Sequence, residues 1–344
     1  MTVFRKGKAR ALVLLVMATL LLLGLTGCDE DWLGIFVTLK DPGVTEDGVE
    51  YGSEDILMAL VDSDGWFKIF DGSEVGLTPK HDIAAFSFNE LLWENYITTP
   101  TPGDFDIIPE LYLTFTQNQI AVPGIATPVR GQDIVKFSET MDGPDPEWQF
   151  DVFFDGSDVG LSTPSEKIDG LGVWPPEYFD YWASDIDIPV DCSGGVIFLT
   201  TQGNYRVPSA TPGQSLVGKG SDVLLFCAFN TGPDTAGLWY RVYNGVKEGI
   251  RPYQAGYSLD VLGFHFNSPS VTDGDLDASV LFMFTPRKPF TAPWLVDPGQ
   301  PSQLFITETG QNGEGPILDF NDLFPSVNGV VDGLSLFDMP FYEP

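Results

Sequence analysis

The sequence predicts an all-β protein, a four-bladed β-propeller with four antiparallel strands in each blade, and three observations lead to this expectation. The composition combines 26 Phe with 37 Gly and 27 Pro, which is typical of strands connected by turns. No long stretch beyond the N-terminal segment shows the 3.6-residue apolar period of an amphipathic helix. A short motif recurs along the chain, and a strand near the N-terminus matches one that the last repeat lacks.

The recurring motif reads Phe-Asp-Gly-Ser-Glu/Asp-Val-Gly-Leu. It occupies residues 70–77 and 154–161, a weaker copy occupies residues 243–250, and residues 318–322 hold a worn fourth copy. Each copy belongs to a unit with four strand-like segments. We expect these blade units at roughly 52–117, 131–203, 220–286 and 301–337. One four-stranded blade cannot bury both of its faces, so stacked neighbours would form the core.

The last unit ends after its third strand, near Phe337. Residues 34–39 resemble the fourth strands of the other units and precede the first unit, so we expect them to close the C-terminal blade. This closure leaves fewer exposed strand edges. It predicts a single domain over residues 28–344, whereas a series of β-sandwich modules is the alternative.

The first 28 residues contain a basic patch, an apolar run at residues 11–25 and the sequence Leu-Thr-Gly-Cys at residues 25–28. This pattern resembles the signal peptide and lipobox of bacterial lipoproteins. The resemblance implies that residues 1–27 are a cleaved signal peptide. It also implies that Cys28 carries the lipid and anchors the protein in the bacterial cell envelope, outside the cytoplasmic membrane. Asp29 resembles an inner-membrane retention signal, although the leaflet stays open, and an uncleaved anchor is the alternative.

The repeat motif itself is similar to one found in uncharacterised secreted bacterial proteins of β-propeller-like organisation, which supplies no activity to carry over.

The net charge of the chain is −32, and removal of residues 1–27, which hold four of the 17 Lys and Arg and none of the 49 Asp and Glu, makes it −36. Such a surface repels nucleic acid, so nucleic acid is not an expected partner. The acids are dispersed rather than clustered in blocks, which favours solubility over one specific cation site.

Two cysteines, Cys192 and Cys227, remain after Cys28. In an exported compartment two cysteines are expected to pair. We predict a disulfide that joins neighbouring blades, with a buried free pair as the alternative.

Calcium is a possible ligand, although no cofactor is required. Two clusters of acids at alternating positions are the candidates for binding it, and both could equally be solvated loop tips. The clusters consist of Asp62 and Asp64, and of Asp273, Asp275 and Asp277.

The acids of the repeat have a structural explanation. We expect the Asp-Gly-Ser segment to form a hairpin corner in which the glycine adopts a positive φ. The acids that open the first and third strands of each unit would satisfy backbone N–H groups, and around a propeller they would form rings at fixed heights. They are Asp55, Asp133, Asp222, Asp82, Asp169, Asp260 and Asp332.

Enzyme signatures are weak. The only histidines are His81 and His265, neither lies in a metal-binding or triad motif, and His81 is explained as a turn residue. A carbohydrate-active hydrolase with paired carboxylates near the propeller axis is the alternative function.

The connections between third and fourth strands are the best candidates for binding, because they are rich in aromatic residues. Such side chains can stack on sugar rings or insert into a groove of a protein partner, or they can pack on themselves to cover a blade. The candidate residues are Trp174, Tyr178, Phe179, Tyr181, Trp182, Trp93 and Tyr96. The sequence therefore predicts a lipid-anchored, non-catalytic protein that presents a binding or scaffolding surface to a protein or glycan.

Overall fold

The computed structural model describes residues 32–45, 47–60, 65–89, 110–140, 147–176 and 192–247, together with the backbone of seven later strand segments between residues 251 and 339. These residues form an all-β structure of antiparallel sheets, with a single turn of 3₁₀ helix at Pro164–Glu166. Within the described part of the chain, no helix has the length and apolar character needed to cross a bilayer.

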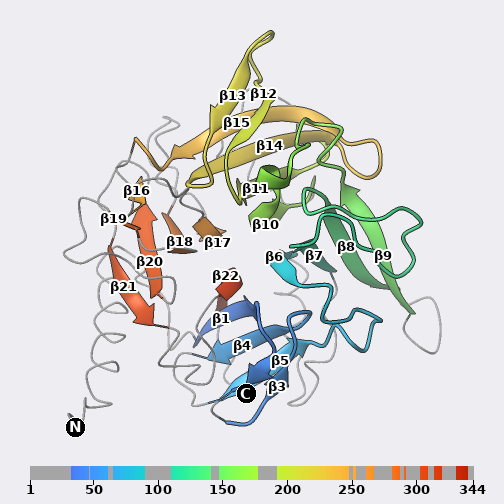
Figure 1. Ribbon diagram of the computed structural model, residues 1–344, viewed down its shortest axis with the longest axis vertical. Coiled ribbons are helices and arrows are strands. Elements are labelled where there is room, and N and C mark those ends of the chain that lie inside the picture. Colours follow the sequence, from blue (N-terminus) through green and yellow to red (C-terminus); the bar gives the residue numbers. More distant parts are fainter. Residues whose placement is uncertain are drawn as a thin grey trace.

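Four sheets of four strands make up the body of the protein (Figure 1). Sheet 1 contains, in spatial order, β22 (Val331–Met339), β1 (Trp32–Leu39), β4 (Ile56–Leu60) and β5 (Trp66–Phe70). Sheet 2 contains β6 (Ile83–Phe88), β7 (Glu110–Phe115), β8 (Ile134–Thr140) and β9 (Glu147–Phe154). Sheet 3 contains β10 (Ile168–Trp174), β11 (Val196–Thr201), β14 (Asp222–Asn230) and β15 (Ala236–Asn244). Sheet 4 contains β17 (Val261–Phe266), β18 (Leu281–Pro286), β20 (Gln303–Glu308) and β21 (Glu314–Asp319).

Three two-stranded sheets complete the described strands. They are β2 (Gly43–Val44) with β3 (Glu50–Tyr51), β12 (Tyr205–Pro208) with β13 (Ser215–Gly218), and β16 (Arg251–Pro252) with β19 (Phe290–Thr291).

In each large sheet one edge strand lies nearest the centre of the molecule in Figure 1: β22, β6, β10 and β17. These four strands contact one another in a cycle: β6 contacts β10, β10 contacts β17, β17 contacts β22, and β22 contacts β6. Hydrogen bonds also join the sheets. The Thr38 hydroxyl donates to the carbonyl of Ile83 at 3.1 Å, and the Thr114 hydroxyl donates to the carbonyl of Ile168 at 3.3 Å.

The N-terminal strand completes the sheet of the C-terminal strand, as expected. β1 lies between β22 and β4, and Gly34 pairs with Phe337 while Val37 pairs with Leu334. Strands from the two ends of the described chain are therefore neighbours in one sheet.

The sheets do not coincide with the predicted blade units. The predicted unit 52–117 contributes β4 and β5 to sheet 1 but β6 and β7 to sheet 2, and the later units divide in the same way. A sequence repeat reveals its period but not where one sheet ends, and here the Asp-Gly motif is the point of change. It follows β5 and precedes β6, so it connects two sheets and is not a hairpin corner.

Apolar side chains fill the spaces between neighbouring sheets. One cluster lies between sheets 1 and 2 and includes Phe36, Phe86 and Phe137, and a second lies between sheets 2 and 3 and includes Phe154, Phe226 and Trp239. All six residues of β6 are buried. Each fully buried side chain of this size contributes about 1.5–3 kcal/mol, so stacking of the sheets is the main source of stability.

Candidate functional site

A buried aspartate and the Asp-Gly or Asn-Gly motif that follows it form a repeated polar cluster, which we call an acidic corner, in each of sheets 1, 2 and 3. Each contains an aspartate at the start of a sheet's third strand: Asp55 before β4, Asp133 before β8, and Asp222 at the start of β14. All three are buried, with exposed fractions of 3%, 7% and 2%. Buried carboxylates need hydrogen-bond donors, and the backbone provides them.

Each corner aspartate accepts a hydrogen bond from the glycine of the motif that follows. The Gly72 N–H lies 3.0 Å from Asp55 Oδ1, and the corresponding distances are 3.1 Å from Gly156 to Asp133 and 3.2 Å from Gly245 to Asp222. The other carboxylate oxygen accepts an N–H from the residue three positions earlier, at 2.8, 2.8 and 3.4 Å. The first-strand acids therefore satisfy backbone groups, as expected.

The motif glycine is required by close packing rather than by its φ angle. A Cβ atom on Gly72, Gly156 or Gly245 would lie within 3.0 Å of the backbone carbonyl oxygen of Glu54, Gln132 or Ser221, respectively. The glycines that adopt positive φ are the second ones of the motif, Gly76 at 84° and Gly160 at 101°. The expectation of a positive φ at the Asp-Gly pair is thus wrong, because the first glycine makes room for the corner.

The motif aspartates bind the serine that follows them. Asp71 Oδ1 accepts both the N–H of Ser73 at 3.1 Å and its hydroxyl at 2.6 Å, and Asp155 binds Ser157 in the same way at 2.9 and 2.6 Å. These are the local side-chain turns expected of such residues. Among the described residues, no group of three or more His, Cys, Asp or Glu side chains could hold a metal ion.

The three corners differ in their cationic partner. Lys68 Nζ lies 2.9 Å from Asp55 and 3.0 Å from Asp71, and Arg241 lies 3.5 Å from Asp222. In sheets 1, 2 and 3 the third strand pairs with the outermost strand, and each pairing has a register shift just after the corner aspartate. The shift makes equivalent positions in the three outermost strands recognisable. The position held by Lys68 and Arg241 is held in sheet 2 by Val152.

The pKa values of two corner carboxyl groups, those of Asp133 and Asp222, are raised by burial. Burial, together with the charge of Asp155, raises the pKa of Asp133 from its ordinary value of 3.8 to about 6, against the opposing effects of two backbone N–H groups and of Arg130. Burial also raises the pKa of Asp222, although Tyr205 and Arg241 oppose this shift. The middle corner therefore exchanges a proton in a range where most surface carboxyl groups are ionised.

The third-strand acids do not form rings at fixed heights. Asp169 lies inside β10 at an irregularity of its pairing with β11, and Asp332 lies at the equivalent place in β22, whereas Asp82 precedes β6. Asp82 accepts a hydrogen bond from the Thr116 hydroxyl at 2.6 Å. Asp260 lies outside the described residues. The irregularity falls at the same place in all three strands, so Asp82 lies two residues before the position that Asp169 and Asp332 occupy.

His81 is a turn residue, as expected. The N–H of Thr78 donates to Nδ1 at 2.9 Å, and Nε2 lies 2.8 Å from the carbonyl oxygen of Ala121. This arrangement fits a neutral imidazole with its proton on Nε2, and both ring nitrogens are used within the fold.

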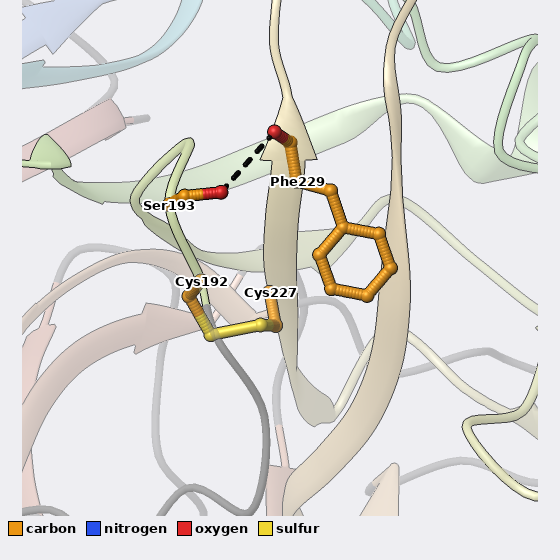
Figure 2. The surroundings of a disulfide bond; sticks show 4 residues. All are labelled: Cys192, Ser193, Cys227 and Phe229. Atoms are coloured by element: carbon orange, nitrogen blue, oxygen red, sulfur yellow. Dashed lines mark hydrogen bonds between the residues drawn. A yellow bond between two sulfur atoms is a disulfide. The ribbon is translucent and has the colours of Figure 1, made fainter.

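The structure contains the expected disulfide between Cys192 and Cys227. Its location differs from the expectation, because Cys227 lies in β14 opposite Val196 of β11 and both strands belong to sheet 3. Figure 2 shows the short turn from Cys192 to β11 fastened to β14, with the Ser193 hydroxyl directed at the carbonyl of Phe229. The prediction of a bond between blades assumed that the fourth strand of one unit and the first of the next belong to different sheets.

Of the predicted binding aromatics, Trp174 is described. It ends β10, is half-buried, and meets the ring of Phe198 edge-on at 4.9 Å. The other predicted binding, metal and lipidation residues lie outside the described residues: Tyr178, Phe179, Tyr181, Trp182, Trp93, Tyr96, Asp62, Asp64, Asp273, Asp275, Asp277 and Cys28.

One polar cluster in sheet 2 is not among those predicted from the sequence. Glu110 Oε1 lies 2.7 Å from Lys136 Nζ, and Glu110 Oε2 accepts hydrogen bonds from Asn89 and Tyr112 at 2.8 and 3.2 Å. Although burial alone would raise it, these partners hold the pKa of Glu110 below its ordinary value. The signal was Lys136, a lysine in an otherwise apolar strand start.

No protein-family model matches the chain, and no curated protein matches it either. The proposals below therefore rest on the sequence and the structure.

Proposed function

We propose that this protein is a lipid-anchored component of the bacterial cell envelope. The residues that support the proposal are the basic patch, the apolar run and the lipobox-like sequence that ends at Cys28. β1 begins only four residues later, at Trp32. A lipid on Cys28 would thus be attached almost directly to a central strand of sheet 1. The leaflet of attachment is left to experiment, with Asp29 favouring the inner membrane.

The body of the anchored protein is a four-bladed β-propeller in this proposal. Support comes from the four sheets of four strands, the cyclic contacts of β6, β10, β17 and β22, and the pairing of β1 with β22. The observation that carries the proposal is this pairing, because strand closure by the N-terminal segment is how a propeller avoids an open seam.

The function we propose is non-catalytic: the propeller presents a surface that binds or scaffolds a protein or a glycan. The buried acids of the repeated corners support this proposal, because their oxygens bind backbone groups and basic side chains of the same fold. The aromatic-rich connections in the sequence, which include Trp174, are the candidate binding segments.

Membrane anchoring is tested on vesicles and by mass spectrometry. Full-length protein expressed in a bacterium is expected to float with lipid vesicles in a density gradient, and its mature N-terminal peptide is expected to carry acyl chains at Cys28. The variant Cys28→Ser should stay unprocessed and lack the acyl mass. An unacylated peptide beginning elsewhere would exclude the proposal.

Binding is tested on a glycan array with the purified protein. Signals lost in both Trp174→Ala and Trp182→Ala, but retained in Trp148→Ala, would support recognition through the aromatic connection. Trp148 is a suitable control because it is an exposed tryptophan in β9, far along the chain from that connection. Glycan turnover that is lost on substitution of acids would instead establish the hydrolase alternative.

A further inference from the structure

The body has two ends along its central strands, and the strand directions distinguish them. We call the tether end the one at which β1 begins and β22, β6 and β10 finish. We call the corner end the one at which β1 finishes and the corner aspartates lie. The pairing of Trp32 with Met339 places the start of β1 beside the end of β22.

Hydrogen bonds between sheets show that these ends agree from sheet to sheet. At the tether end, the N–H of Val173 near the end of β10 donates to the hydroxyl of Ser87 near the end of β6, at 3.0 Å. At the corner end, Thr38 of β1 donates to Ile83 at the start of β6. Sheets 1, 2 and 3 thus present the same ends in the same direction.

The aromatic-rich connections leave and rejoin the body at the tether end. One joins the end of β6 to Glu110 at the start of β7, and another joins Trp174 at the end of β10 to Val196 at the start of β11. Both Trp174 and Glu110 are half-buried at this end. The corner aspartates lie at the opposite end, because they stand at the starts of β4, β8 and β14. The Asp-Gly and Asn-Gly motifs lie there too, because they stand at the ends of β5, β9 and β15 and their glycines donate to the corner aspartates.

Chain length limits which end can meet a membrane. The four peptide units from Cys28 to Trp32 span at most about 14 Å when fully extended. β1 has eight residues, which at about 3.3 Å per residue make it about 26 Å long. A lipid on Cys28 therefore cannot reach past the body to the corner end.

We infer that the tether end faces the bilayer and that the corner end is presented away from it. This inference rests on the proposed lipidation of Cys28. The surface partner at the tether end is a zwitterionic lipid interface, because the processed chain of net charge −36 (13 Lys and Arg against 49 Asp and Glu) is repelled by anionic headgroups. Trp and Tyr are favoured at such interfaces, where an apolar ring and a polar atom are both accommodated. A protein or glycan that approaches from the aqueous side meets the corner end.

The test uses three reporter cysteines, each in its own variant of the full-length, lipidated protein. Pro176→Cys lies two residues beyond β10 at the tether end, and Lys40→Cys lies directly after β1 at the corner end; both positions are exposed. Each variant is labelled with a fluorophore without reductant, so that the Cys192–Cys227 disulfide stays intact, and is bound to phosphatidylcholine vesicles containing a nitroxide-headgroup lipid. A second corner-end reporter, Lys80→Cys, precedes β6 and is also exposed.

The nitroxide is expected to quench the label at residue 176 several-fold more strongly than the labels at residues 40 and 80. Equal quenching, or stronger quenching at the corner-end positions, would overturn the inferred orientation. Flotation of the same samples separates this failure from failure of the anchor. A protein that floats with the wrong quenching order contradicts only the orientation, whereas a protein that does not float contradicts the proposed function as well.

Discussion

The first and the middle acidic corners have the same backbone and different charges. Asp55 and Asp133 accept hydrogen bonds from equivalent glycines at 3.0 and 3.1 Å, and both are buried. Asp55 also has an ion pair with Lys68, whereas Val152 occupies that position beside Asp133. The repeated motif therefore has one hydrogen-bonding geometry in both corners, whereas the charge balance of each corner depends on one residue of the outermost strand.

Burial, together with the charge of Asp155, gives the middle corner a pH dependence of known sign. The pKa of Asp133 is about 6 in the folded protein, above its ordinary value of 3.8. The folded state therefore binds this proton more tightly than the unfolded state does, and the resulting stability is present below about pH 4 and lost as the pH rises to about 6. A tenfold difference in proton affinity between the folded and unfolded states corresponds to about 1.4 kcal/mol.

The largest effect is predicted for substitution of the motif glycine, which both corners have. Gly72→Ala and Gly156→Ala each place a Cβ against a backbone carbonyl oxygen that belongs to the strand start. Because the backbone must move, we expect each substitution to lower the free energy of unfolding by about 2–4 kcal/mol in urea titrations. Gly65→Ala is the control, since its added Cβ meets nothing closer than 3.7 Å. A loss no larger than that of the control would contradict the packing explanation.

The second prediction concerns a substitution that gives the first corner the apolar residue found in the middle corner. Lys68→Val removes the ammonium group between Asp55 and Asp71 and leaves a buried carboxylate without its cation. The side chain of Lys68 is 24% exposed, so we expect a loss of about 1–3 kcal/mol at pH 7. The loss should be smaller at pH 4, because Lys68 is one of the groups that lower the pKa of Asp71 against the effect of burial, and that contribution declines as the pH falls.

Lys40→Val is the matched control for this experiment, because Lys40 is exposed and lies outside the corner. Urea titrations of both variants at pH 4 and pH 7 measure the difference. An equal loss at the two pH values would show that Lys68 acts through packing of its aliphatic chain and not through its charge.

The arrangement of strands into sheets could be predicted only in part from the sequence. The period of the repeat, the β class and the partnership of residues 34–38 with the C-terminal strand follow from apolar patterning and self-similarity. The sequence does not show which strands of neighbouring units share a sheet. A strand with both faces buried, such as β6, has no alternation of apolar and polar residues that would identify its neighbours. The sequence therefore predicts the Cys192–Cys227 bond between the right residues, but it predicts a link between blades where the bond lies within sheet 3.

The polar contacts were predictable where they are local. Asp71 binds Ser73 two residues away, which a short motif can reveal. The partnership of Asp55 with Lys68 and that of Glu110 with Lys136 depend on strand pairing over 13 and 26 residues, and one irregularity in the register changes which side chains meet. That Val152 occupies the position of Lys68 beside Asp133 is likewise visible only after the strands are paired.

The third prediction concerns the reverse substitution, which gives the middle corner the lysine found in the first corner. Val152 is half-buried in β9 at the position equivalent to Lys68, so Val152→Lys is expected to bring an ammonium group toward Asp133 and Asp155. The pKa of Asp133 should fall, and the protein should gain about 1 kcal/mol at pH 7. The decline of stability between pH 4 and 6 should become shallower in thermal unfolding curves. Val152→Met, which keeps the apolar stem without the charge, should leave that decline unchanged.

The smallest predicted effect concerns a hydrogen bond that both corners retain. Ser73→Ala and Ser157→Ala each remove a hydroxyl that donates to the motif aspartate at 2.6 Å, while the backbone N–H of the same residue still donates to it. We expect a loss of about 0.5–1 kcal/mol in each variant by urea titration. The loss should be larger for Ser157, because Asp71 keeps Lys68 as a partner and Asp155 has no lysine at that position. Equal losses in the two variants would show that the turn, and not the charge around it, determines the contribution of the serine.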